Sequence, residues 1–346
     1  MSMLEHDKKA PDVAAESDDP HARVSTGLTL RMAETYGFVL AFVAVIIVFS
    51  VLPATGDTFA SLANVRSIIG NQSTVLIISV GMVIPLLAGN IDLSVGATAG
   101  ATSVVTAAAV SRFDVPLGLA IVLGMVFALI VGVVNGILIA RVSANSFIIT
   151  FGVGTLIGGL LQWYTKSLPI TANLPKAFQN FGNQNWLGLP RLTFALIPIV
   201  IVALILQDHT PYGRHLQAIG SNERAARLVG IPVQRSILLS FVASSALAGA
   251  AGIILTARSG GADPAAGPSF LFPAFAAVFL GMAMIRPGKP NVIGTVIAVL
   301  FLAAAVSGFT MAGANSWVRD VFNGAALLIA ISMATWFGKR QGAKRI

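Results

Sequence analysis

The chain contains no cysteine and few charged residues. With no cysteine among its 346 residues, it has no disulfides, no thiolate metal sites and no catalytic thiol. Only 10% of its residues are charged, whereas soluble domains carry about a quarter. A composition this poor in charge excludes an ordinary soluble protein.

Several catalytic motifs are absent as well. The sequence has no GxxxxGK[ST] phosphate loop, so it has no route to ATP hydrolysis by that motif. The apolar runs contain no pair of carboxylates for general acid–base chemistry. The histidines lie outside these runs and show no metal-ligand spacing: His6, His21, His209 and His215. We therefore expect no catalytic residues, no metal and no cofactor.

Apolar runs dominate what is present. Hydrophobic residues make up 55% of the chain and the mean hydropathy is +0.83. About 20 residues of helix cross the ~30 Å hydrocarbon core of a bilayer. The sequence therefore predicts an all-α polytopic membrane protein with about ten transmembrane helices, at 36–52, 68–88, 93–110, 117–140, 146–164, 192–206, 236–257, 269–285, 292–310 and 318–337.

Basic residues indicate the orientation. Residues 1–35 are predicted to be a disordered cytoplasmic tail, 36–338 the membrane domain, and 339–346 a basic cytoplasmic tail. With ten spans and a cytoplasmic N-terminus, 15 of the 22 Lys and Arg residues fall inside. The seven outside are Arg66, Arg112, Lys166, Lys176, Arg191, Arg258 and Arg319. This bias favours both termini in the cytoplasm, and it explains the net charge of +8 without a nucleic-acid partner.

A charged segment, Thr210–Pro232, interrupts the apolar sequence. Such a segment does not belong in hydrocarbon, and the charge bias places it in the cytoplasm. Ser221 or Asn222 can cap a short helix in which Glu223 suits the first turn, and Gly230 ends it. Its apolar stripe comprises Ala225, Ala226, Leu228 and Val229. Because a two-turn helix is marginal in water alone, we expect it to lean on something larger.

A second informative stretch places a carboxylate between two apolar runs. Asp92 follows Gly89 and Asn90 and precedes Ser94, so we predict a broken helix here. The carboxylate then has two possible roles. It can cap the free N–H groups of the next span, or the break can line a translocation path.

Glycine pairs predict close helix packing. Gly96/Gly100, Gly132/Gly136 and Gly154/Gly158 have small-xxx-small spacing on predicted spans. This spacing lets helix backbones approach closely within a membrane.

Four stretches together resemble the membrane permease of bacterial ABC importers of the ribose/xylose/arabinose/galactose class. They are GNIDLSVGA (89–97), VNGILIARVSANSFIITFG (134–152), TPYGRHLQAIGSNERAARLVGI (210–231) and GTVIAVLFL (294–302). The resemblance covers about Phe59 to Trp336. The chain departs from the family pattern at Ser221, at Asn90 and in LGMAMIRPGKP (280–290), each replacing a usual glycine or a glycine-rich turn. These departures can alter the lining of the path, which leaves the identity of the substrate open.

The resemblance implies a sugar or polyol permease of the bacterial inner membrane without an active site of its own. It implies a separate ABC ATPase, a periplasmic solute-binding protein, a second permease copy and surrounding lipid as partners. The residues implied to couple the permease to the ATPase are Gly220, Ser221, Asn222, Glu223, Ala225, Ala226, Arg227 and Gly230.

Other functions stay open at this point. A permease for nucleosides or branched-chain amino acids is the closest alternative. A stand-alone secondary carrier would transport without ATP, and a membrane enzyme would need polar catalytic groups within its spans.

Overall fold

The computed structural model describes residues 39–142, 144–171, 174–286 and 288–343. The predicted tail 1–35 lies outside these residues, as do the last three residues of the predicted basic tail. Residues 339–343 of that basic tail belong to the final helix.

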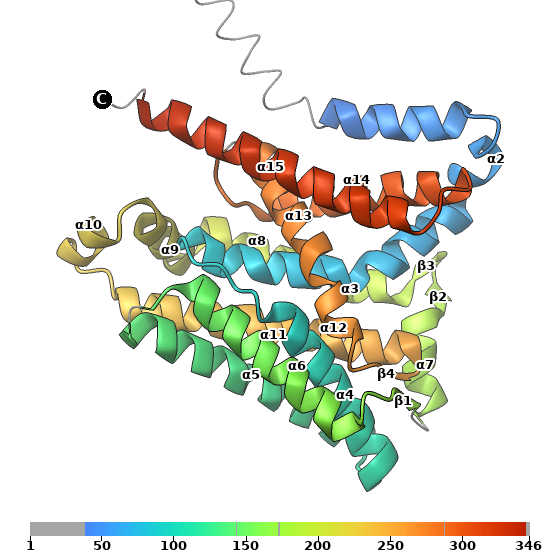
Figure 1. Cartoon of the computed structure of the whole chain (residues 1–346), viewed down its shortest axis with the longest axis horizontal. Helices are drawn as coiled ribbons and strands as arrows, with labels where there is room; N and C mark the ends of the chain where they lie inside the picture. Colours follow the sequence, from blue (N-terminus) through green and yellow to red (C-terminus); the bar gives the residue numbers. More distant parts are fainter. Residues whose placement is uncertain (1–38, 143, 172–173, 287, 344–346) are drawn as a thin grey trace, which may run out of the picture.

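The described chain is a helical bundle (Figure 1). Its long helices are α3 (Leu62–Leu87), α4 (Val95–Phe113), α5 (Leu117–Val142), α6 (Ser146–Thr165), α8 (Arg191–His209), α11 (Val233–Ser259), α13 (Leu271–Ala283), α14 (Val292–Met311) and α15 (Trp317–Ala343). The shorter helices are α1 (Val39–Val51), α2 (Gly56–Phe59), α7 (Lys176–Asn183), α9 (Pro211–Ser221), α10 (Glu223–Leu228) and α12 (Ala266–Ser269).

Seven helical segments of the described part are long and apolar enough to cross a membrane. They are α3, α5, α6, α8, α11, α14 and the segment Ala266–Ala283, which joins α12 to α13. The chain is thus a mostly helical, multi-pass protein. The other predicted spans correspond to α1, which is short, to α4, which is rich in alanine, glycine, threonine and serine, and to α15.

Helix α3 begins six residues earlier than the sequence predicts. Ser61 caps it, since its hydroxyl oxygen accepts a hydrogen bond from the Asn64 N–H at 3.2 Å. The added turns carry polar residues that were predicted to be loop.

Helix α11 forms the centre of the bundle, packing against α3, α4 and α5. Two of the three predicted glycine pairs make close contacts. A Cβ at Gly132 or Gly136 would lie within 3 Å of the α11 backbone, and one at Gly96 would lie 2.8 Å from the Gly267 carbonyl oxygen. In the third pair, a Cβ at Gly154 would lie 3.5 Å from the Leu93 carbonyl oxygen, and a Cβ at Gly158 would meet no described atom within 4 Å.

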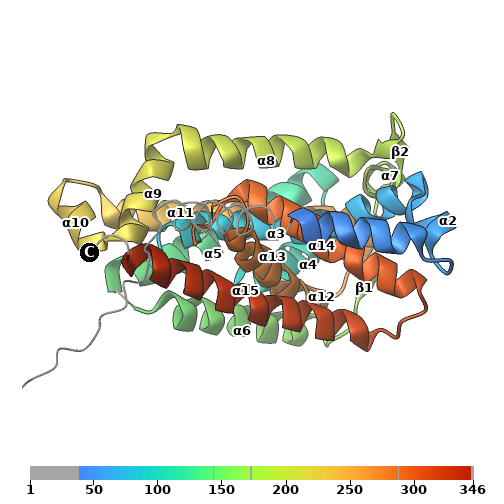
Figure 2. The same ribbon diagram turned by 90° about the horizontal axis from the view of Figure 1, so that it is seen from above.

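The predicted polar loop 165–191 contains regular structure. Helix α7 lies there, β1 (Ile170–Thr171) pairs antiparallel with β4 (Gly261–Ala262), and β2 (Asn185–Trp186) pairs with β3 (Leu189–Pro190). These elements gather with α2 at one end of the molecule, whereas α9 and α10 lie at the opposite end (Figure 1). Helix α8 borders one side of the bundle, and α6 and α15 border the other (Figure 2).

Candidate coupling site and helix break

The charged segment folds into two helices rather than one. Thr210 caps α9, with its hydroxyl oxygen accepting from the Gly213 N–H at 3.1 Å, and Pro211 occupies the first helical position. Asn222 caps α10, with its amide oxygen accepting from the Ala225 N–H at 3.0 Å. Of the two predicted caps, the structure therefore selects Asn222, and α9 is a helix that was not predicted.

Helix α10 projects from the bundle and exposes apolar side chains. Leu228 is 89% exposed and Val229 76%, while Ala226 alone of the predicted stripe is buried. Glu223 and Arg227, one turn apart, form an exposed ion pair at 2.6 Å. Gly230 ends the helix region with a φ of +82°, the left-handed conformation that favours glycine.

Helix α9, in contrast, is firmly anchored. Leu216 and Ile219 are buried, and the Tyr212 hydroxyl donates to the Ser236 carbonyl oxygen of α11 at 3.0 Å. Burial raises the pKa of Tyr212 above its ordinary value, so the phenol keeps its proton and this bond to a higher pH than an exposed tyrosine would.

The charged segment touches the helix break. A Cβ at Gly220 would collide with the Leu87 carbonyl oxygen at the end of α3, and a Cβ at Gly89 would lie 3.9 Å from the Gly220 Cα. Only glycine fits at position 220 without a shift of one backbone or the other. The two stretches singled out in the sequence are therefore neighbours in space.

The break lies where the sequence predicts it. Helix α3 ends at Leu87, Gly89 adopts a φ of +79°, and α4 begins at Val95. The non-helical backbone between them bonds to α6. The Ile91 N–H donates to the Ser146 hydroxyl at 3.1 Å, and the Leu93 N–H donates to the Thr150 hydroxyl at 2.9 Å. Buried backbone donors need such partners, particularly at membrane depth.

Asp92 sits at the centre of the break and is 1% exposed. One carboxylate oxygen accepts from the Ser94 N–H at 3.0 Å and from the Ser94 hydroxyl at 2.6 Å, and the other accepts from the Ser244 hydroxyl of α11 at 2.9 Å. The Asn135 amide of α5 donates to the Ser94 hydroxyl at 2.8 Å. The carboxylate thus closes a turn just before α4 rather than capping the first turn of that helix. Neither salt bridge of the described residues involves Asp92.

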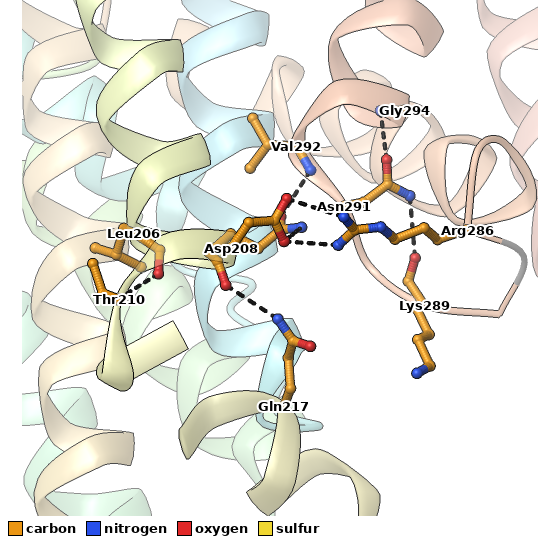
Figure 3. A network of polar contacts seen from close by, with 10 residues as sticks. Leu206, Asp208, Thr210, Gln217, Arg286, Lys289, Asn291, Val292 and Gly294 are labelled. Atoms are coloured by element: carbon orange, nitrogen blue, oxygen red, sulfur yellow. Dashed lines mark hydrogen bonds and ion pairs between the residues drawn. The ribbon is translucent and has the colours of Figure 1, made fainter. Parts of the chain in front are cut away.

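A second polar network ties the start of the charged segment to the loop before α14 (Figure 3). The Arg286 guanidinium binds both oxygens of Asp208, at 2.7 and 3.1 Å. The Gln207 side-chain oxygen accepts from the Val292 N–H at 3.0 Å, and the Gln217 amide of α9 donates to the Gln207 carbonyl oxygen at 3.1 Å. Helices α8, α9 and α14 therefore meet at one polar joint.

The sequence does not identify the partners that complete these networks. Four of them, Asn135, Ser146, Thr150 and Ser244, stand within or at the start of predicted spans. An amide or hydroxyl inside an apolar run was the available signal, but it does not indicate which partner the side chain meets. Among the described residues, no group of three or more His, Asp or Glu side chains could hold a metal ion.

The family model described as "Branched-chain amino acid transport system / permease component" matches residues 64–331. The ribose import permease protein RbsC of Bacillus subtilis (strain 168) is 34% identical over 85% of this chain and 90% of its own length. RbsC of Haemophilus influenzae is 30% identical over 87% and 94%. The autoinducer 2 import system permease protein LsrD of Photorhabdus temperata is 29% identical over 87% and 92%. No solved structure matches.

The family match covers more than half of the chain, and the relatives match along most of their own length. Membership implies an ATPase and a substrate-binding protein as partners. The chain belongs to the family of multi-pass permease subunits of inner-membrane ABC importers.

Proposed function

We propose that this permease passes a sugar or a sugar-like polyol into the cytoplasm, driven by an ABC ATPase that docks on α10. Two of the relatives described above are named ribose import permeases, and at 34% and 30% their identities exceed the 29% of the autoinducer 2 permease. The family description, which names branched-chain amino acids, supports the second candidate, an amino-acid permease.

Contacts among four segments between the spans support the proposed orientation. Ten spans with cytoplasmic termini would put residues 89–94, 141–145, 207–235 and 286–291 on the same side. Their boundaries are in direct contact in the fold: Ile91 bonds to Ser146, Gly220 packs on Leu87, and Asp208 pairs with Arg286. This agreement supports one side for all four segments, and the positive charges of the last three segments support the cytoplasm as that side.

The exposed tip of α10 has the character of a contact surface. Leu228 and Val229 present exposed apolar area beside Arg224 and Arg227. Arginine is enriched at protein interfaces, and adjoining exposed apolar area suits a partner that covers it. The helix is only six residues long and packs mainly on α9. The fold of this chain alone therefore gives no reason to leave these apolar side chains in water.

A docked ATPase would then act through α9 on the break. The Gly220 backbone rests on the end of α3, and the Gln217 amide holds the Gln207 backbone at the polar joint. A shift of α9 would move the end of α3 and the start of α14 together. Two sites linked this way share a coupling free energy, typically ~1–3 kcal/mol.

The direct test is reconstitution with the ATPase and the binding protein in proteoliposomes. We expect uptake of labelled D-ribose or a related polyol that requires ATP and both partners. Uptake by the permease alone without ATP would identify a secondary carrier instead. ATP-dependent uptake of L-leucine, with none of ribose and related polyols, would favour the amino-acid candidate.

A further inference from the structure

At the end of the bundle opposite α10, helices α3, α13, α14 and α15 enclose a cavity of about 780 Å³. We call it the outer funnel. Its volume falls within the range typical of small-molecule sites. Helix α3 lines it with one face, at Asn64, Ser67, Ile68, Asn71, Gln72 and Val75, which is the spacing of a single helical stripe.

The outer ends of the lining helices carry polar residues, including the oppositely charged neighbours Arg319 and Asp320, and aliphatic residues follow at depth. Ser67 and Ser307 lie near the outer ends of their helices, whereas Val75, Val299 and Leu327 lie further along them. The distance along α3 from Asn64 to Val75 is ~16 Å at the helical rise of ~1.5 Å per residue. A solute entering the funnel would therefore meet amides and hydroxyls before it reached an apolar floor.

Four polar side chains of the mouth are held in place by hydrogen bonds: Asn64, Ser67, Asn71 and Ser307. The Arg258 guanidinium donates to the Asn71 amide oxygen at 2.6 Å, and the Asn71 amide nitrogen donates to the Ser67 hydroxyl at 3.1 Å. The Ser307 hydroxyl donates to the Asn64 amide oxygen at 2.8 Å, which joins α14 to α3. These bonds fix the wall on which a ligand would rest.

Two amides are left free. Within the described residues, the side chains of Gln72 on α3 and Asn323 on α15 line the funnel without a hydrogen-bond partner. Each amide offers donors and an acceptor in a fixed plane. A sugar hydroxyl both donates and accepts, so neighbouring hydroxyls complement such amides. A lipid chain would leave both amides unsatisfied.

We propose that the outer funnel binds a neutral polyhydroxylated solute, with Gln72 and Asn323 as its direct ligands. This inference depends on the orientation proposed above, which makes the funnel open to the periplasm. The aromatic ring of Phe272, which is 67% exposed in the funnel lining, supplies an apolar surface for the C–H face of a sugar.

The absence of cysteine from the chain makes a clean test possible. Gln72→Cys and Asn323→Cys are made singly in the assembled importer, and each variant is qualified for labelling by the normal membrane abundance of the assembled complex, not by uptake. Spheroplasts, which have lost the soluble binding protein, are then treated with a charged thiol reagent that does not cross membranes. Gln184→Cys is the matched control, since Gln184 is exposed at the same end but outside the funnel.

We expect all three cysteines to react from outside. D-ribose at about ten times its Kd should slow the reaction at positions 72 and 323 about tenfold and leave position 184 unchanged. L-leucine should protect none of them. In the Asn323→Cys chain, adding Gln72→Ala should raise the ribose concentration for half protection by about fivefold, because it removes one hydrogen bond.

The contrary outcomes separate this inference from the proposed function. Reaction from outside without protection by ribose would overturn the polyol site and leave the permease function standing. Protection by leucine instead would overturn the ligand class. Reaction only in inverted vesicles would overturn the orientation, and with it the proposed function. An unchanged ribose concentration in the Gln72→Ala chain would remove Gln72 as a ligand.

Discussion

The helix break and helix α10 are linked through α9, yet their polar residues differ in burial and in hydrogen bonding. At the break, every oxygen of the Asp92 carboxylate has a donor, and the backbone N–H groups of Ile91 and Leu93 reach hydroxyls on α6. On α10, the Glu223–Arg227 pair bridges only one turn of its own helix, with both side chains about half exposed.

The difference separates residues that hold the fold from residues available to a partner. Removing a buried, paired group costs the full desolvation of whatever it leaves behind. Removing an exposed pair within one helix costs a few tenths of a kcal/mol. Mutations at the break should therefore reduce the amount of folded permease, and mutations on α10 should reduce transport alone.

Asp92→Leu should have the largest effect on folding. Leucine accepts no hydrogen bond, so the Ser94 N–H, the Ser94 hydroxyl and the Ser244 hydroxyl all lose their acceptor. Each donor that finds no replacement costs ~1–3 kcal/mol. We expect low membrane abundance and a lowered midpoint of thermal unfolding, measured on detergent-purified protein.

Asp92→Asn is the matched control for that substitution. Its remaining oxygen can keep both Ser94 donors, and the Ser244 hydroxyl can rotate to accept from the new amide. Abundance should be near normal and uptake largely kept. Equal and severe loss of uptake in the Asn and Leu variants at normal abundance would mean that the charge itself serves the path. Unchanged uptake in the Leu variant would contradict both roles.

Gly220→Ala should have the next largest effect. The added Cβ would collide with the Leu87 carbonyl oxygen, a backbone atom that has little room to move, and such overpacking costs ~1–3 kcal/mol. Gly158→Ala on α6 is the control, because nothing lies within 4 Å of that position. The thermal midpoint should fall in the first variant and hold or rise in the second. A fall of equal size in both would contradict the contact between α9 and α3.

Part of this arrangement could be predicted from sequence. The break at Gly89 and the two ends of α10 depend on the conformational preferences of single residues. Asn222 favours the start of a helix, and Gly230 favours its end. Helix α9 was missed because Gly213 and Gly220 look like helix breakers. In the fold both are required, since a Cβ at either would meet backbone oxygens. Glycine that is selected by a tertiary contact cannot be distinguished in sequence from glycine that ends a helix.

The outer funnel and the polar joint escaped prediction for a different reason. Asn64 and Asn71 stand near the start of a helix that was placed six residues too late, and their partners are far away in the chain. Asp208 and Arg286 are likewise 78 positions apart. A single sequence contains each member of such a pair but not the packing that brings the two together.

Asp208→Asn should have a moderate effect. It leaves the Arg286 guanidinium with one neutral acceptor in place of a two-pronged carboxylate. Since both side chains are partly exposed, we expect a loss of only about 0.5–1 kcal/mol. The double variant with Arg286→Gln should be less destabilised than the sum of the single variants, measured as a double-mutant cycle on thermal unfolding. Strict additivity would mean that the pair contributes nothing to the joint.

The smallest effect on folding, with a large effect on transport, is expected at α10. Glu223→Lys and Arg227→Glu each break one exposed ion pair at 2.6 Å, which contributes roughly 0.3–0.5 kcal/mol. Abundance and thermal midpoint should match the unmodified permease. If the ATPase docks here, each reversal also places a charge next to a group of the same sign on the ATPase. Uptake and substrate-stimulated ATPase activity should then both fall severely. The double variant Glu223→Lys/Arg227→Glu should restore the ion pair within the helix but not transport, because both charges facing the ATPase would still have the wrong sign. Full uptake and ATPase activity in both single variants would show that α10 is not the docking helix.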